Sequence, residues 1–215
     1  MTKQSYKFVM ASTLILVCSV IPVSYAADDT NIHTFSGPYD YTNPTHVRYK
    51  LSVVERHHLN KDVLSLTRGQ SSSIADDLSF ALRAFPNHHP ALNAMAKLWR
   101  RHMRTKSIPL GIDRDKNPEY WFNKAITFAP HDGVVHLLYG IHLHKLGKLD
   151  QALKHYKKAE AIHPDLAEVH YNIGLLYLKR KEYKQAKEHG QTAYKLGYPL
   201  PGLKNKLIAA GVWGD

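Results

Sequence analysis

The chain contains a single cysteine, Cys18, which lies in an N-terminal segment that we expect to be removed. The remaining residues then form no disulfide bond and offer no cysteine nucleophile and no thiolate metal ligand. The sequence also lacks an HExxH helix, a phosphate-binding loop, a nucleophile elbow and a Gly-rich dinucleotide turn. These absences predict that the protein is not an enzyme and that it has neither catalytic residues nor a cofactor.

Acidic residues are also few, with 18 Asp and Glu against 29 Lys and Arg and a formal net charge of +11. Between Lys145 and Lys206 there are 13 basic and 6 acidic side chains. This excess is typical of a solvated helix face, but it also favours contact with an acidic protein or with an anionic membrane or cell-wall surface. We expect no nucleic-acid partner, because the lysines are not interleaved with aromatic side chains on which bases could stack. The basic surface consists of Lys179, Arg180, Lys181 and Lys184.

Histidine is abundant, with 15 residues. On the predicted helices no two histidines are four residues apart, and adjacent pairs such as His57-His58 and His88-His89 cannot readily chelate one ion from one face. We therefore predict no metal site, while a site assembled across distant segments, and with it a metal-binding function, stays open as a weaker alternative.

Residues 1–26 resemble a secretory signal peptide. Lys3 and Lys7 precede an apolar run over residues 8–20, and Ser24-Tyr25-Ala26 places small residues at the −3 and −1 sites of a cleavage point. Cleavage after Ala26 would give a periplasmic or secreted protein. The alternative is an uncleaved anchor, because the apolar run is nearly long enough to span a bilayer.

Residues 27–73 are expected to form an extended arm that carries one short helix. Gly37, Pro38, Asn43 and Pro44 punctuate an aromatic strip over residues 35–50, and proline disfavours helix at and before its own position. A short helix over residues 61–68 then follows the N-cap Asn60, and residues 70–73 are interpreted as a linker.

From residue 74 onwards, apolar side chains recur at helical spacing. Asn117 with Pro118, and Asp132, have the form of helix N-caps, while Asp165 and Glu168 have the spacing of a capping box. The expected helices cover residues 76–85, 89–104, 118–129, 133–146, 151–162, 166–180, 182–196 and 203–210.

A repeat of 34 residues organises the second half of the chain. When residues 133–166 are aligned with 167–200, small residues coincide: Gly140 with Gly174, Ala152 with Ala186, and Ala159 with Ala193. A unit of this length is a pair of helices that buries its apolar face only by stacking on neighbouring units. The sequence therefore predicts an all-α solenoid.

These units resemble tetratricopeptide repeats, which have bulky residues at positions 4, 7 and 11, small ones at 8, 20 and 27, and an aromatic at 24. The second unit departs from that pattern at Gly190, where the aromatic is usual, and at Tyr198, where proline is usual. The resemblance implies degenerate repeat helices over residues 74–132 with an inserted loop at 105–117, two full repeats at 133–166 and 167–200, and a capping helix and tail at 201–215.

Tetratricopeptide arrays generally bind a protein segment in a groove lined by the first helix of each unit. The resemblance therefore implies a protein or peptide partner, an adaptor function in assembly of an envelope complex, and a monomer or weak oligomer. The aromatic strip over residues 35–49 is an alternative, internal occupant of the groove. Positions 2, 5, 9 and 12, together with position 6 of the second unit, give the groove residues Val134, Leu137, Ile141, His144, Glu168, Tyr171, Asn172, Leu175 and Leu178.

Overall fold

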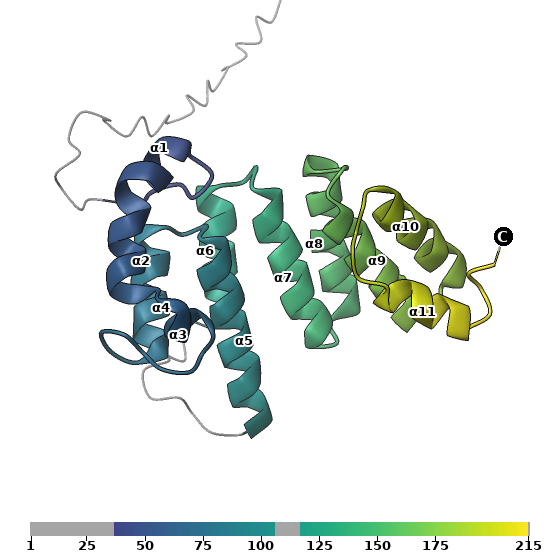
Figure 1. Ribbon diagram of the computed structural model, residues 1–215, viewed down its shortest axis with the longest axis horizontal. Coiled ribbons are helices and arrows are strands. Elements are labelled where there is room, and N and C mark those ends of the chain that lie inside the picture. The colour runs from purple at the N-terminus through teal and green to yellow at the C-terminus, as the bar shows by residue number, and fades with distance from the viewer. Residues whose placement is uncertain (1–36, 106–116, 215) are drawn as a thin grey trace, which may run out of the picture. The chain divides into compact units, whose positions relative to one another are not determined.

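The computed structural model describes residues 37–105 and 117–214, and this part of the chain is helical, without a β-strand (Figure 1). The predicted all-α class is therefore confirmed. The expected signal peptide, residues 27–36 and residues 106–116 of the inserted loop lie outside the described residues. Among the residues described, no helix is both long and apolar enough to cross a membrane.

From residue 61 onwards the helices follow the predicted order, and three short helices precede them. In chain order, the helices are α1 (Pro44–His46), the π-helix η1 (Val47–Leu51), α2 (Ser52–His58), α3 (Lys61–Leu64), α4 (Ile74–Ala84), α5 (His89–Thr105), α6 (Pro118–Phe128), α7 (Gly133–Lys145), α8 (Leu149–Ile162), α9 (Ala167–Lys179), α10 (Tyr183–Lys195) and α11 (Gly202–Ala209).

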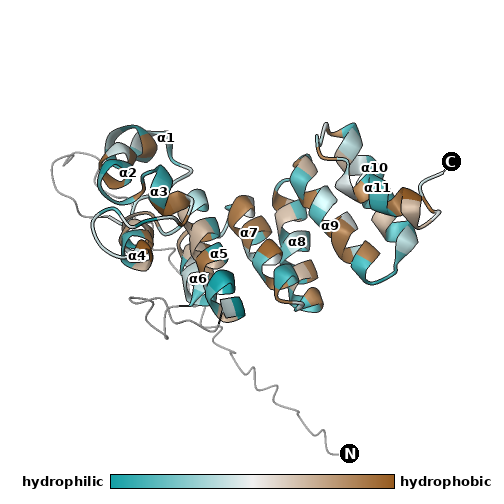
Figure 2. Cartoon of the chain, turned by 60° about the horizontal axis from the view of Figure 1, so that its bottom comes forward, coloured by the Kyte–Doolittle hydropathy of each residue, from teal (hydrophilic) through white to brown (hydrophobic). Residues whose placement is uncertain are grey.

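Each 34-residue unit is a pair of packed helices. Helix α7 packs on α8, and α9 packs on α10, while contacts between α8 and α9 and between α5 and α7 join one pair to the next. Figure 2 shows that hydrophobic and hydrophilic residues are mixed on each of these helices, as expected where one helix packs on several neighbours. The 34-residue period therefore corresponds to one helical hairpin.

Two N-caps agree with the sequence analysis. The side chain of Asn117 accepts a hydrogen bond from the amide of Tyr120, with Pro118 in the first turn of α6. Asp132 accepts from the amides of Val134 and Val135 at the start of α7. The predicted capping box of α9 is wrong, because the N-cap residue is Leu166, whose side chain cannot accept a hydrogen bond.

The extended part of the N-terminal arm is shorter than predicted, because helix begins at Pro44, whereas the first helix was expected at residue 61. The side chain of Asn43 caps this helix and accepts from the amides of Thr45 and His46. With Pro44 at its first position, the helix begins with the same Asn-Pro pair that opens α6. Helix α2, which follows, was not predicted and packs on α4.

The aromatic strip docks at the turn between α4 and α5. The amide of Tyr39 donates to the carbonyl of Ala84 over 2.7 Å, and the amide of Tyr41 donates to the side chain of Asn87 over 2.9 Å. Asn87 in turn donates to Asp132, which caps α7. One buried carboxylate thus connects the strip, the α4–α5 turn and the first full repeat.

Glycine allows the two helices of a full repeat to approach closely. A Cβ atom added at Gly140 on α7 would lie 2.4 Å from Cδ1 of Tyr156 on α8, whose side chain is fully buried. At Gly174, the corresponding position, the nearest atom would be a terminal methyl carbon of Leu203 on α11, at 2.5 Å. The first contact is with a rigid ring and the second with a flexible side chain.

We expect Gly140→Ala to be more destabilising than Gly174→Ala. Alanine gains about 1 kcal/mol of helix propensity at either site, but overpacking against a rigid ring costs about 1–3 kcal/mol. Urea denaturation should show a free energy of unfolding lower by up to about 2 kcal/mol for Gly140→Ala and changed by less than about 1 kcal/mol for Gly174→Ala. Equal losses in the two variants would contradict this account of the packing.

Candidate protein-binding surface

The predicted groove residues on α7 do not all reach the surface. Val134, Ile141 and His144 are half-buried, whereas Leu137 is only 1% exposed. Helix α7 packs against α5 and α9 as well as α8, and these contacts enclose Leu137 in the main hydrophobic core. Leu137 is therefore a core residue, and a polar substitution there would test folding more than binding.

On α9, the chain's own C-terminal segment covers part of the predicted groove. Tyr171, Leu175 and Leu178 pack against a cluster that includes Leu203 and Leu207 of α11. The ring of Tyr171 also stacks on Tyr198, with centroids 4.1 Å apart. Helix α11 contacts both α9 and α10, and Figure 1 shows it lying across them. This segment leaves less of α9 available to a partner than the sequence implied.

Two polar groove positions on α9 lie at its N-terminal end. Glu168 is exposed. The side-chain amide of Asn172 donates to the backbone carbonyl of Glu168 over 2.8 Å. Asn172 is half-buried, so its side chain supports the helix backbone as well as facing solvent. With the half-buried residues of α7, these two side chains form the accessible remainder of the predicted set.

The first helix of the preceding unit, α5, adds residues that the sequence analysis missed. Counting the groove positions from His89 gives Asn93, Lys97 and Arg100, of which Lys97 is exposed and the other two are half-buried. Nη1 of Arg100 donates to Nδ1 of His142 on α7 over 2.9 Å, so this face of α5 adjoins α7. The sequence analysis expected the helix over residues 89–104 but counted groove positions only in the two full repeats.

The aromatic strip does not occupy these groove positions. Its described residues contact the α4–α5 turn, where Tyr41 lies against the rings of His88 and His89 with centroids 4.5 and 4.9 Å apart. Tyr39 lies against Phe85 in the same region. For residues 37–49, the alternative of an internal guest in the groove of α7 and α9 is therefore not supported.

The predicted basic surface is partly neutralised by acidic neighbours. Lys179, Lys181 and Lys184 are exposed, but the guanidinium of Arg180 is half-buried and forms ion pairs with Asp150 and Glu182. Lys181 has a positive φ of 62° at the turn after α9, where Gly147 occupies the corresponding position after α7. Three lysines, one of them in a turn conformation that favours glycine, therefore make up the exposed part of this surface.

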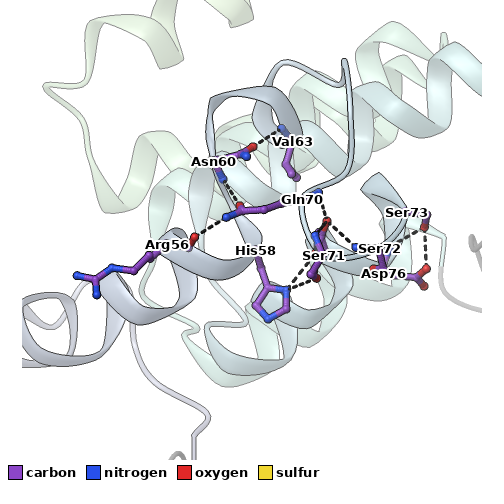
Figure 3. A network of polar contacts seen from close by, with 10 residues as sticks. Arg56, His58, Asn60, Val63, Gln70, Ser71, Ser72, Ser73 and Asp76 are labelled. Carbon is purple, nitrogen blue, oxygen red and sulfur yellow. Dashed lines mark hydrogen bonds and ion pairs between the residues drawn. The ribbon is translucent and has the colours of Figure 1, made fainter.

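A polar cluster near Ser71 superficially resembles a catalytic triad (Figure 3). Nδ1 of His58 lies 3.0 Å from both Oδ1 of Asp77 and Oγ of Ser71. In a Ser-His-Asp triad the hydroxyl and the carboxylate contact opposite ring nitrogens, whereas here both contact the same one. The buried carboxylate of Asp77 also accepts from the amides of Gln70 and Ser71, so the cluster anchors the loop before α4.

Comparison with known proteins identifies the repeats. The model described as TPR repeat matches residues 140–181, and the model described as Tetratricopeptide repeat matches residues 167–196. No curated protein matches the chain. A solved structure titled Functional Characterization of Pseudomonas Aeruginosa pilF is similar in fold, with a TM-score of 0.51 and 19% sequence identity. The match covers 77% of this chain and 65% of that chain, which is slightly less than two thirds of its length.

Proposed function

Residues 140–196 match tetratricopeptide repeats, and we propose that the chain is an exported adaptor that binds a protein or peptide partner during assembly of an envelope complex. Repeats of this family support protein binding. The proposal of export depends on the signal-like character of residues 1–26, and the proposal of envelope assembly depends on export.

The observation that carries the binding proposal is the partly exposed face of α7. Val134 and Ile141 present apolar side chains there, and α5 places Lys97 and Arg100 on the adjoining helix. Apolar side chains at the centre of such a face stabilise a complex by burial, and charged side chains around them orient the partner. We therefore propose a guest segment that carries aliphatic or aromatic side chains together with acidic ones.

Site-specific photo-crosslinking in intact bacterial cells tests this proposal. A photo-reactive amino acid at position 141 or 144 should give a discrete crosslinked protein, recovered with the envelope fraction. The same amino acid at position 191, where Gln191 is exposed on α10, serves as the matched control and should give none. Recovery of the chain only from the cytosol would contradict export.

The competing function is association of the basic surface with anionic membrane or cell-wall material. Charge reversal at Lys179, Lys181 and Lys184 should leave the crosslink at position 144 intact, whereas Ile141→Asp should abolish it. If charge reversal releases the protein from the envelope and crosslinks form at position 184 instead, the binding surface proposed on α7 is wrong and the basic-surface function is favoured.

A further inference from the structure

Three side chains that can ligate a metal converge where the two full repeats meet. Glu160 comes from α8, His170 from α9 and His189 from α10. Nδ1 of His170 lies 3.3 Å from Nδ1 of His189 and 3.5 Å from Oε1 of Glu160, and Nδ1 of His189 lies 3.7 Å from the same oxygen. His170 is buried and the other two are half-buried, so the cluster is enclosed on one side and accessible on the other.

These distances fit metal coordination better than they fit direct hydrogen bonding. Zinc binds imidazole nitrogen and carboxylate oxygen at about 2.0–2.2 Å in tetrahedral geometry, which places neighbouring ligand atoms about 3.3–3.5 Å apart. The three observed separations lie at or just above that range. As hydrogen bonds, the two contacts with Glu160 would be longer than the usual 2.7–3.2 Å or so.

We propose that Glu160, His170 and His189 bind a divalent transition-metal ion of the Zn²⁺ class. Two imidazoles and one carboxylate are a ligand set that suits such an ion, and three protein ligands leave a fourth position for water or for a group from a partner. This metal site goes beyond the proposed adaptor function, because the argument for it does not depend on which surface binds a partner.

A hydrogen bond outside the cluster supports this assignment. Nε2 of His170 lies 2.7 Å from the backbone carbonyl of Pro164, to which it donates. That bond requires the proton of the neutral ring to be on Nε2, so Nδ1 keeps its lone pair and can bind a metal. Such an outer contact, which sets the tautomer and orientation of a ligating histidine, is typical of metal sites.

The first full repeat contains the same histidine pair without the carboxylate. Nδ1 of His136 lies 3.1 Å from Nδ1 of His155, and these residues precede His170 and His189 by 34 positions. The residue that precedes Glu160 by 34 positions is Ile126. The histidine pair alone is therefore a shared packing feature, and Glu160, from the last helix of the first repeat, completes the three-ligand set of the second pair.

Lys157 is the charged neighbour that opposes cation binding. Its Nζ atom lies 2.8 Å from Oε2 of Glu160, while Oε1 faces the histidines. The lysine therefore leaves one carboxylate oxygen for a metal, but its positive charge repels the ion. Replacing Lys157 with methionine should tighten metal binding, whereas a cluster held together only by hydrogen bonds would give no saturable binding in either protein.

The test uses the purified full chain after removal of metal with a chelator. Titration calorimetry with ZnCl₂ should give one saturable site, and Zn²⁺ should raise the melting temperature while Mg²⁺ does not. Co²⁺ should produce the visible absorption of a tetrahedral ion. Glu160→Gln and His189→Ala should each weaken binding at least about tenfold and remove the cobalt absorption.

His155→Ala is the matched control, because it removes the corresponding histidine of the first repeat. Circular dichroism should show that each variant remains folded. The control should leave the Zn²⁺ affinity and the cobalt absorption unchanged. Absence of a saturable site in the wild-type chain, or equal weakening by His155→Ala and His189→Ala, would overturn the proposal. Either result would leave the photo-crosslinking test of the adaptor function unaffected.

Discussion

Acidification from about pH 7 to about pH 4 is expected to lower the free energy of unfolding by up to about 3 kcal/mol for each of two buried histidines. His88 is fully buried, and His142 is 1% exposed. Burial lowers the pKa of each to about 4, so each imidazole stays neutral in the folded chain under conditions that protonate it in the unfolded one.

The charges around the two rings reinforce the effect of burial. Arg100 and Lys148 further lower the pKa of His142, although Glu119 opposes them, and His89 further lowers the pKa of His88. Because the folded pKa values lie below the ordinary value of about 6.5, the stabilisation is fully present above that pH. It is lost as the pH falls from about 6.5 towards 4, where the unfolded chain binds protons that the folded chain does not.

Urea denaturation at about pH 7 and about pH 4 measures this loss. His142→Gln should keep an acceptor for Arg100 and reduce the pH dependence by up to about 3 kcal/mol, whatever its stability at neutral pH. His131→Gln, at an exposed histidine, is the control and should leave the pH dependence unchanged. A free energy of unfolding that does not vary between the two pH values would refute the assignment.

Asp132→Ala is expected to lower the free energy of unfolding by about 3–4 kcal/mol, through loss of a helix cap and of buried hydrogen bonds. Oδ1 of Asp132 accepts from the amides of Val134 and Val135, while Oδ2 accepts from Asn87 over 3.0 Å and from His89 over 2.7 Å. Burial alone would raise the pKa of Asp132, but the hydrogen bond and the charge of His89, together with the hydrogen bonds from Asn87 and Val135, outweigh it and lower that pKa. The carboxylate therefore stabilises the fold at neutral pH, and this contribution disappears as the pH falls through its lowered pKa.

Asp165→Ala is the control, since Asp165 is exposed and does not cap α9, whose N-cap residue is Leu166. It should change the free energy of unfolding by less than about 0.5 kcal/mol. Asp132→Asn should fall between the two variants, because the amide oxygen can still cap α7. Urea denaturation of the three variants at neutral pH measures these differences. Equal losses of unfolding free energy in the two alanine variants would show that the buried carboxylate of Asp132 is dispensable.

Local signals predicted most of the helices, and long-range contacts account for most errors. The N-caps Asn117 and Asp132 were found because a cap is a relation between neighbouring residues. The same Asn-Pro pair at Asn43 was misinterpreted, since nearby glycine and proline residues favour extended chain. That Asp132 also binds Asn87, 45 residues away, could not be inferred from any local pattern.

The sequence correctly predicted which helices carry the candidate site residues, but it did not predict how exposed those residues are. Repeat positions correctly located Ile141 and Tyr171 on first helices, because position depends only on the 34-residue period. Burial depends on which helices pack against them: Leu137 lies in the main hydrophobic core, and the C-terminal segment packs on Tyr171. The cluster of Glu160, His170 and His189 was missed for the same reason, because its members come from three different helices.

The π-helical turn Val47–Leu51 has a further consequence for how this chain can vary in evolution. A π-helical turn accommodates one residue more than an α-helical turn, and one residue corresponds to about 100° of rotation. This surplus residue lets Leu51 and Val54 face the core while the preceding strip still reaches Asn87. The length of this segment is therefore more constrained than its composition: exchanges at the exposed Tyr49 and Val53 are tolerable, whereas a one-residue deletion would misalign the strip with its docking site.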